Sequence, residues 1–168
     1  MNMQNELNNI SIIPGNLAHL ADCRAAMQES ELGRVYFASD EKTLSYLTVG
    51  LQAGEIYIAV NDAGCVFGFA WIKPAGAFGF HYLSVLAVKN EYRGRGIGKK
   101  LLTFFEEQGF KERARVCLLV SDFNKDAQRL YRSLGYEQVG YAPSLYLDGV
   151  DELIMIKRRP ETSCSTQS

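Results

Sequence analysis

The pattern of apolar positions in the first third of the chain predicts two helices. Within residues 15–30 apolar side chains recur every three or four positions, which is the repeat of one helix face; they are Leu17, Leu20, Cys23 and Met27. A second helix follows with an apolar face of Leu44, Leu47 and Leu51. Ser39 or Asp40 is suited to cap its start and Gly54 to end it.

Apolar runs bounded by turn residues predict the strands of a sheet. Residues 55–60 and 65–72 flank the turn sequence "NDAG" and are typical of a hairpin, and residues 80–88 form a third strand. The run "VCLLVS" at 116–121 is continuously apolar, as in a strand covered on both faces. The last two predicted strands, joined by a loop containing "LDGVD", are residues 135–142 and 152–158.

Two helices alternate with these strands in the second half of the chain. One carries an apolar face of Ile97, Leu101, Phe104 and Phe105 and ends near Arg113, and a shorter one lies between Asn124 and Gly135. Counting a strand before the first helix, the predicted order is β-α-α-β-β-β-α-β-α-β-β. The fold class is therefore α/β, a mixed α+β domain of about seven strands and about four helices on both faces. Residues 80–121 have a connection long enough for a parallel crossover.

Composition limits the classes of function. The 168 residues are 47% hydrophobic with a net charge of −1, which fits one domain with no general attraction to nucleic acid or anionic membrane. No apolar run reaches the roughly 18 residues of a membrane span, and the first residues do not resemble a secretory signal. We expect a cytoplasmic domain over residues 1–159 and a polar, disordered tail over 160–168.

The cysteines predict neither a metal site nor disulfides. The four are far apart, none forms a CxxC pair, and neither histidine lies at metal-ligand spacing from one. We expect reduced thiols, as in a cytoplasmic protein, and no bound metal.

A glycine-rich turn follows the third predicted strand. Its sequence is Arg93, Gly94, Arg95, Gly96, Ile97 and Gly98, and then Lys99 and Lys100 enter a helix. Glycines let a backbone approach a ligand closely, and the N–H groups at a helix start form an anion site. The turn matches neither the dinucleotide fingerprint nor the P-loop, because Lys99 replaces the third glycine of the first and Lys100 the Ser or Thr of the second. The alternatives are a pyrophosphate-like ligand faced by the basic side chains, or a turn with solvated lysines.

Two motifs resemble those of the GNAT superfamily of acetyl-CoA-dependent N-acetyltransferases. The turn matches the family's Gln/Arg-x-x-Gly-x-Gly/Ala signature, and Arg93 follows the strand-end Val88 by five residues. Downstream, "NKDAQRLYRSLGYEQVG" is similar to the family's Asn-x-x-Ala-x-x-x-Tyr-x-x-x-Gly-Phe/Tyr segment. The resemblance covers about residues 10–158, most strongly 80–140, and implies a single domain with a mostly antiparallel central sheet.

The resemblance also implies a role for individual residues. Backbone groups of Leu86, Ala87 and Val88 would hold the pantetheine arm and the acetyl carbonyl. The N–H groups from Arg93 to Lys99 would bind the pyrophosphate of the coenzyme; these residues are Arg93, Gly94, Arg95, Gly96, Ile97, Gly98 and Lys99. Asn124 would contact the pantetheine or thioester, and Tyr131 would protonate the departing thiolate.

The chemistry of thioester aminolysis supports the role of Tyr131. A phenol with a pKa of about 10 can resupply a proton to a thiolate whose conjugate acid has a pKa of about 8.5, and the N–H of Val88 is suited to donate to the oxyanion. The alternative is a core tyrosine, because Ala127, Leu130, Tyr131 and Leu134 share a helix face.

The sequence departs from the family pattern at the general base. The two positions where members carry a glutamate hold Tyr82 and Leu119 here. His81 is one candidate substitute, with a suitable pKa of about 6.5; the alternatives are a base that acts through water and no base at all. A missing glutamate favours an acceptor of low pKa such as an α-amino group, at about 8, over a lysine side chain, at about 10.4.

These observations predict an N-acetyltransferase that uses acetyl-CoA and no metal. The acceptor would be a primary amine, on a small molecule or on a peptide or protein, attacking directly, since neither motif contains a cysteine. It would approach past the N-terminal helices and the 74–80 and 141–150 loops, near Tyr36, Phe37 and Trp71. The alternatives are a non-catalytic acyl-CoA sensor and a nucleotide-phosphate binder, and exposed edge strands near the C-terminus permit a homodimer.

Overall fold

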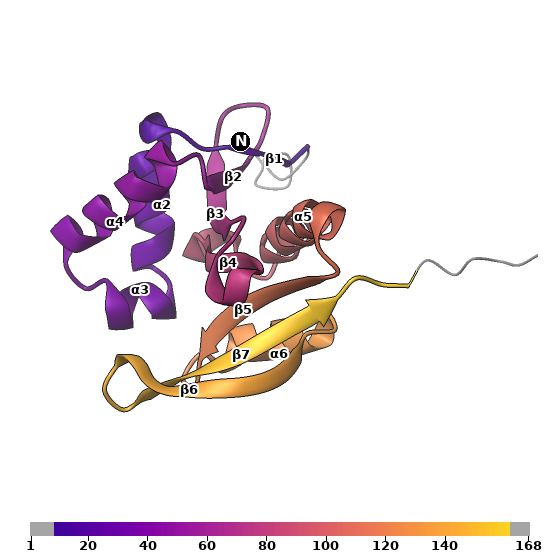
Figure 1. The fold of residues 1–168 in the computed structure, drawn as a ribbon. Helices are drawn as coiled ribbons and strands as arrows, with labels where there is room; N and C mark the ends of the chain where they lie inside the picture. The colour runs from indigo at the N-terminus through magenta and orange to yellow at the C-terminus, as the bar shows by residue number, and fades with distance from the viewer. Residues whose placement is uncertain (1–8, 162–168) are drawn as a thin grey trace, which may run out of the picture.

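The computed structural model describes residues 9–161, which form one sheet with helices packed on both sides (Figure 1). Residues 1–8 of the predicted domain and 162–168 of the predicted tail lie outside the described part. The strands are β1 (Ser11–Pro14), β2 (Ile56–Val60), β3 (Val66–Lys73), β4 (His81–Val88), β5 (Arg115–Ser121), β6 (Glu137–Leu147) and β7 (Val150–Arg158). They lie in the order β1-β2-β3-β4-β5-β7-β6, and every neighbouring pair is antiparallel except β4 and β5. The predicted parallel crossover over residues 80–121 is confirmed.

Five α-helices connect the strands. They are α2 (Leu20–Gln28), α3 (Glu31–Tyr36), α4 (Asp40–Gln52), α5 (Ile97–Glu112) and α6 (Lys125–Ser133), with 3₁₀ turns at Leu17–His19, Ala77–Gly79 and Asn90–Tyr92. Ser39, one of the two caps predicted, caps α4, and Asn124 caps α6. None of the helices in residues 9–161 is both long and apolar enough to span a bilayer.

The short helix α3 is the element that the sequence pattern did not predict. The side chain of Ser30 accepts a hydrogen bond from the Gly33 N–H and so starts a new helix directly after α2. The chain folds back so closely that a Cβ at Gly33 would lie 1.8 Å from the Met27 carbonyl oxygen. A serine cap and a close backbone contact therefore stabilise this helix, and it lacks the apolar periodicity by which a sequence predicts one.

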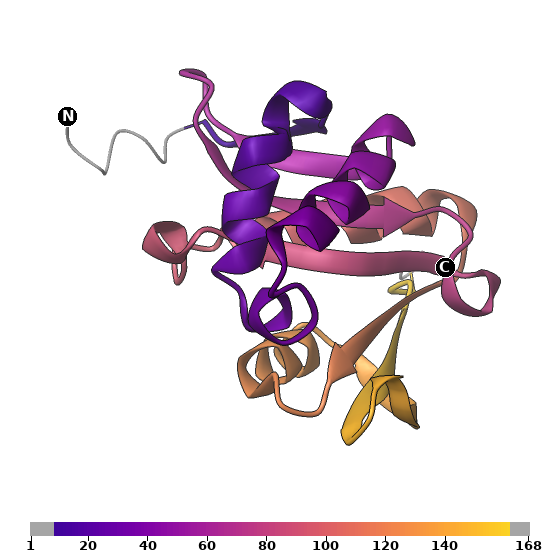
Figure 2. The same ribbon diagram turned by 90° about the vertical axis from the view of Figure 1, so that its left-hand side faces the viewer.

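The two faces of the sheet carry separate cores. Figure 2 looks onto the face covered by α2 and α4, where Met27, Leu47, Phe69 and Trp71 are buried together. On the opposite face, α5 and α6 bury a core that contains Phe67, Leu101, Phe105, Tyr131 and Met155. The prediction of helices on both faces is confirmed.

β4 and β5 part after a short pairing. They pair only at His81↔Val116, Tyr82↔Cys117 and Leu83↔Leu118. On its other side β4 stays paired with β3 as far as Val88, with an irregularity that places Ser84 as an extra residue in β4. The remainder of β4 therefore diverges from β5 and opens the sheet at its centre.

The C-terminal hairpin is longer than the sequence pattern predicts. β6 continues to Leu147 and β7 begins at Val150, so the predicted loop shrinks to a turn at Asp148 and Gly149. The pairing of the two strands is irregular between Ala142 and Leu147, where Ser144 has a positive φ of 48°. This irregularity interrupts the alternation of apolar and polar residues that would have predicted the longer strand.

Candidate active site

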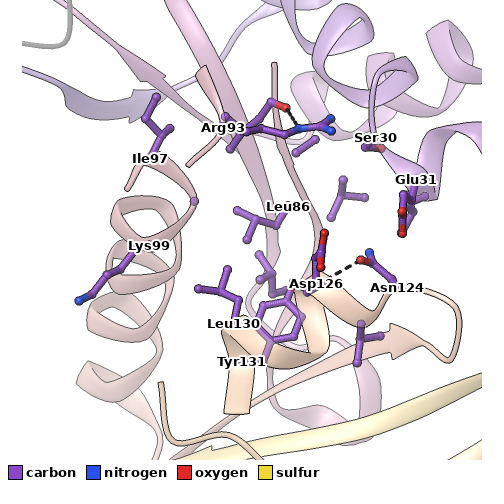
Figure 3. Close-up of a pocket in the computed structure, with 18 of the residues that line it drawn as sticks. Ser30, Glu31, Leu86, Arg93, Ile97, Lys99, Asn124, Asp126, Leu130 and Tyr131 are labelled. Carbon is purple, nitrogen blue, oxygen red and sulfur yellow. Dashed lines mark hydrogen bonds between the residues drawn. The ribbon is translucent and has the colours of Figure 1, made fainter. Parts of the chain in front are cut away.

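A pocket of about 550 Å³ lies where β4 and β5 part (Figure 3). One wall is β4 from Leu83 to Val88, and the other is the end of β5 with the start of α6. The turn into α5 closes one end, and Ser30 and Glu31 at the start of α3 border another side. Every residue that the sequence assigned to coenzyme binding lines this pocket except Arg95.

The backbone of β4 offers unpaired groups to this pocket. The N–H of Lys89 donates to the Phe67 carbonyl at 2.9 Å, so in an antiparallel pair alternate residues of β4 bond to β3. The N–H groups of Leu86 and Val88 therefore point away from β3, towards the side where β5 has diverged. The Val88 carbonyl is already used, because it accepts from Arg93 Nε at 3.0 Å.

The glycine-rich turn leads into a helix without a cap. Gly94 and Gly96 have φ values of 71° and 80°, in the left-handed region that favours glycine. No side chain caps α5, and its first turn contains no acidic residue. The first N–H groups of a helix have no partner within it, so this end presents donors and the positive end of the helix dipole to the pocket.

Arg93 has a different surrounding from the expected one. Its N–H donates to the Asn90 carbonyl at 3.2 Å, and its guanidinium donates to the carbonyls of Val88 and, at 2.8 Å, Glu29. The Glu29 carboxylate in turn accepts from the Asn90 N–H at 2.6 Å. Arg93 therefore fastens the turn to the end of α2, and the open donors begin after it.

Two lysines beside the turn differ in their surroundings. Lys99 extends outward from α5, away from Leu86 and Tyr131 (Figure 3). Lys89, before the turn, pairs with Asp22 of α2 at 2.7 Å. Neither lysine therefore directs its charge into the pocket.

Helix α6 places Asn124 and Tyr131 on the opposite wall. The Asn124 oxygen accepts from the Ala127 N–H at 3.2 Å, which leaves its amide nitrogen to donate. Tyr131 is only 7% exposed, and burial raises the pKa of its phenol. The phenol is thus protonated at neutral pH, and Tyr131 belongs to the pocket wall.

Several residues suggested for the acceptor side or as base lie elsewhere. His81 does not line the pocket; it is buried beneath α5, with its ring 5.4 Å from that of Phe105 and no partner for either nitrogen. Trp71 is buried and donates to Glu55 at 2.8 Å, and Phe37 packs on Tyr46. The prediction that His81 replaces the missing glutamate is wrong in this geometry.

One polar cluster at the pocket wall was missed by the sequence analysis. The Tyr36 hydroxyl donates to Glu152 Oε1 at 2.6 Å, and the Ser121 hydroxyl donates to the same oxygen at 2.7 Å. Ser121 lines the pocket, while Glu152 is 3% exposed behind it on β7. A carboxylate at the head of the apolar run "ELIMIKR" was the one available signal.

The described part of the chain contains no group of side chains suited to hold a metal ion. Within residues 9–161 no three His, Cys, Asp or Glu side chains gather as they would around a metal ion. The pocket instead combines backbone donors, hydroxyl groups and carboxylates, which are groups suited to an anionic coenzyme and an amine.

Comparison with known proteins places this pocket in a family context. Residues 21–136 match the family model for the acetyltransferase (GNAT) family. The chain is 37% identical over 106 residues to an uncharacterized N-acetyltransferase of Methanocaldococcus jannaschii, covering 62% of this chain and 66% of that protein. It is 34% identical over 102 residues to the N-alpha-acetyltransferase RimI of Mycobacterium tuberculosis, covering 59% and 63%. The chain thus matches about two thirds or less of the length of these relatives.

A solved structure has the same fold. It is that of yncA, a putative acetyltransferase from Salmonella typhimurium, with its cofactor acetyl-CoA. The TM-score is 0.68 over 96% of this chain and 100% of that one, at 17% sequence identity. The mixed, mostly antiparallel fold that the sequence predicted is thereby confirmed.

Proposed function

This chain belongs to the acetyltransferase (GNAT) family, and on that premise we propose that it transfers an acetyl group from acetyl-CoA to a primary amine. The observation that carries the proposal is the divergence of β4 from β5. It creates a pocket with unpaired β4 backbone groups on one wall, an uncapped helix start at one end and a buried tyrosine opposite.

The turn into α5 suits the pyrophosphate of the coenzyme. The N–H groups of Gly96 to Lys99 lie at the positive end of the helix dipole. An anion there is stabilised by hydrogen bonds from these groups and by the dipole. The open φ of Gly94 and Gly96 lets the backbone reach the phosphate oxygens. Arg93 holds this turn in place through α2, so its role is to position the donors.

The free edge of β4 suits the pantetheine arm and the thioester. The amide groups of the arm would bond to Leu86, as a strand bonds to a sheet edge. The Val88 N–H would donate to the thioester carbonyl, whose oxygen gains negative charge as the amine attacks.

Tyr131 would supply the proton for the leaving thiolate. Its phenol is buried and protonated, and it lies on the wall that faces β4. A proton donor held at the leaving group is worth roughly a hundredfold or more in rate. Asn124, the N-cap of α6 and about two turns before Tyr131, would donate its free amide N–H to the thioester region.

The proposed acceptor is an α-amino group, of a peptide or protein or of a small molecule. A relative named as an N-alpha-acetyltransferase supports this choice, and so does the low pKa of such amines, about 8. The exposed, unpaired thiol of Cys65 supports a reducing, cytoplasmic setting.

The discriminating experiment measures binding and turnover in the same preparation. We expect acetyl-CoA to bind more tightly than ATP, and thiol to be released in the presence of amino acids, polyamines, aminoglycosides or peptide N-termini. Tight binding of acetyl-CoA with no thiol release on any amine would favour the acyl-CoA sensor. Tighter binding of ATP than of coenzyme A would favour the nucleotide-phosphate binder.

A further inference from the structure

Glu152 is a buried carboxylate that has no cationic partner. It is 3% exposed on β7, directly opposite Ser121 in the β5–β7 register. Its recorded partners are two hydroxyl groups, and no ion pair in the part of the chain from residue 9 to 161 involves it. Burying a carboxylate without a cation is costly, so such a group gains from a positive charge brought close to it.

Both hydroxyl groups point their protons at the same oxygen. Tyr36 Oη and Ser121 Oγ lie 3.2 Å apart and each donates to Glu152 Oε1. Burial, with the added effect of Glu152, raises the pKa of Tyr36 to about 12, so Tyr36 remains a donor. A serine hydroxyl has one proton and two lone pairs. Because its proton is committed to Glu152, Ser121 can only accept from a further group.

Ser121 connects this cluster to the pocket. Ser121 lines it, and its carbonyl is fixed by hydrogen bonds from Gln128 Nε2 at 3.0 Å and from the Asn124 N–H at 3.1 Å. The cluster is therefore a rigid hydrogen-bond acceptor. It lies on the pocket wall that also carries Asn124 and Tyr131. The ring of Tyr36 also packs against Phe123 and Tyr146, at 6.1 and 6.3 Å, which brings α3 and the β6–β7 hairpin to the same place.

We propose that Ser121 binds the acceptor amine and that Glu152, acting through Ser121, takes up its first proton; this rests on the proposed acetyl transfer. The ammonium donates an N–H to Ser121 Oγ, the Ser121 proton moves to Glu152, and Ser121 takes the amine proton. The products of this step are a neutral amine and a neutral Glu152 carboxyl group. Glu152 loses the proton to solvent after the acetylated product leaves.

The second amine proton completes the balance. It leaves the nitrogen as the N–C bond forms and the C–S bond breaks, and it replaces the proton that Tyr131 gives to the thiolate. In this scheme Ser121 touches the substrate, whereas Glu152 and Tyr36 are positioning residues. The titratable groups that act on Tyr36 are Glu152 and Asp122, and Tyr146 of β6 lies against its ring.

The test is the pH profile of Glu152→Gln with the best amine from the panel. This substitution keeps the shape and removes the proton acceptor. An α-amine with a pKa of about 8 is about one tenth neutral at pH 7, so we expect kcat/KM to fall about tenfold at that pH. The deficit should shrink as pH rises to the pKa of the amine. The reason is that neutral amine from solution then needs no proton acceptor. An equal loss at every pH, or no loss, would overturn the proposal.

Companion variants separate chemistry from folding. Glu137→Gln removes an exposed carboxylate from β6 and should leave the profile of the unmodified protein unchanged. Ser121→Ala should reproduce the pH-dependent loss even if Glu152→Gln does not fold, with unchanged affinity for acetyl-CoA. A Ser121→Ala profile parallel to that of the unmodified protein would contradict the relay.

The inference and the proposed function fail in distinguishable ways. If the unmodified protein acetylates no amine, both are overturned. If it acetylates an amine and the Glu152→Gln profile is parallel to its own, only the relay is wrong.

Discussion

At the scale of single residues, burial decides what each polar side chain can do. Tyr131 and His81 are almost equally hidden, at 7% and 6% exposure. Burial keeps the phenol of Tyr131 protonated by raising its pKa, and keeps the ring of His81 neutral by lowering its pKa, an effect that Glu112 partly opposes. The first lines the pocket and the second does not, so Tyr131 is placed to meet a ligand, whereas the unpartnered ring nitrogens of His81 cost stability.

Replacing Tyr131 by phenylalanine should slow acetyl transfer without weakening coenzyme binding. We expect kcat to fall about a hundredfold, because the thiolate must then leave without a positioned proton donor. Tyr136→Phe is the matched control, since its ring lies 5.8 Å from that of Tyr131 but outside the pocket lining. Equal kcat values for the two variants would contradict the assigned role.

His81 should make the free energy of unfolding depend on pH. Its pKa lies below the value of about 6.5 in an unfolded chain, so the unfolded state binds a proton more readily. Stability should be full above about pH 6.5 and fall as pH drops through that value towards the folded pKa. Urea unfolding of His81→Leu should lack this decline, and its free energy of unfolding at pH 7 should be about 1 kcal/mol higher, because two unpaired ring nitrogens are removed.

The outcome for the second histidine gives the control for this experiment. His19 lies on the surface, where its ring accepts from the Asn16 N–H. A His19→Ala variant should therefore keep the decline below pH 6.5. If the decline in stability disappeared in His19→Ala but not in His81→Leu, then His19 and not His81 would be its cause.

At the scale of elements, the turn into α5 combines a left-handed backbone conformation with open N–H donors. Gly96 has a φ of 80° and Gly64, in the β2–β3 turn, has 81°, and a Cβ at either position meets nothing within 4 Å. Alanine should cost each about 1 kcal/mol of stability through strain alone. Only Gly96→Ala should also weaken acetyl-CoA binding, by tenfold or more, as measured by calorimetry. Equal affinities would mean that the turn does not bind the coenzyme.

The contact between α2 and α3 should be sensitive to a single methyl group. Gly33→Ala places a Cβ 1.8 Å from the Met27 carbonyl oxygen, so α3 must move and carry Tyr36 with it. We expect a loss of about 2 kcal/mol in the free energy of unfolding and a raised KM for the amine with unchanged affinity for acetyl-CoA. A normal KM in a folded variant would show that α3 does not shape the acceptor site.

The elements differ in how far the sequence could predict them. Those with a clear periodicity, such as β4, α5 and α6, were placed to within one or two residues. Helix α3 was not, because it depends on a capping serine and a close approach at Gly33 instead of an apolar face. The extension of β6 was missed because the irregularity after Ala142 hides the alternation.

At the scale of the whole molecule, the residues assigned to the coenzyme could be predicted from the sequence, whereas those proposed for the amine could not. The residues assigned to the coenzyme come from one strand, one turn and two helices between positions 86 and 131, so local motifs could gather them. The cluster that we propose for the amine joins Tyr36 to Ser121 and Glu152, which are 85 and 116 positions away in the chain. Only the pairing of β5 with β7 and the docking of α3 bring them together, and no single-sequence pattern carries that information.

The sheet also explains why the site lies at its centre. A single parallel pair, β4 and β5, interrupts an otherwise antiparallel sheet, and its divergence opens the pocket between the two cores. The outer edge, β6, exposes Val139, Tyr141 and Tyr146. The homodimer suggested for this edge stays a prediction.

The most direct test of acetyl transfer is the mass spectrum of both the amine and the protein after incubation with acetyl-CoA. We expect one N-acetyl group on the amine for each coenzyme thiol released, and no acetyl group retained by the protein. Coenzyme bound and retained without an acetylated amine, or an acetyl group attached to the protein, would contradict direct transfer in this pocket.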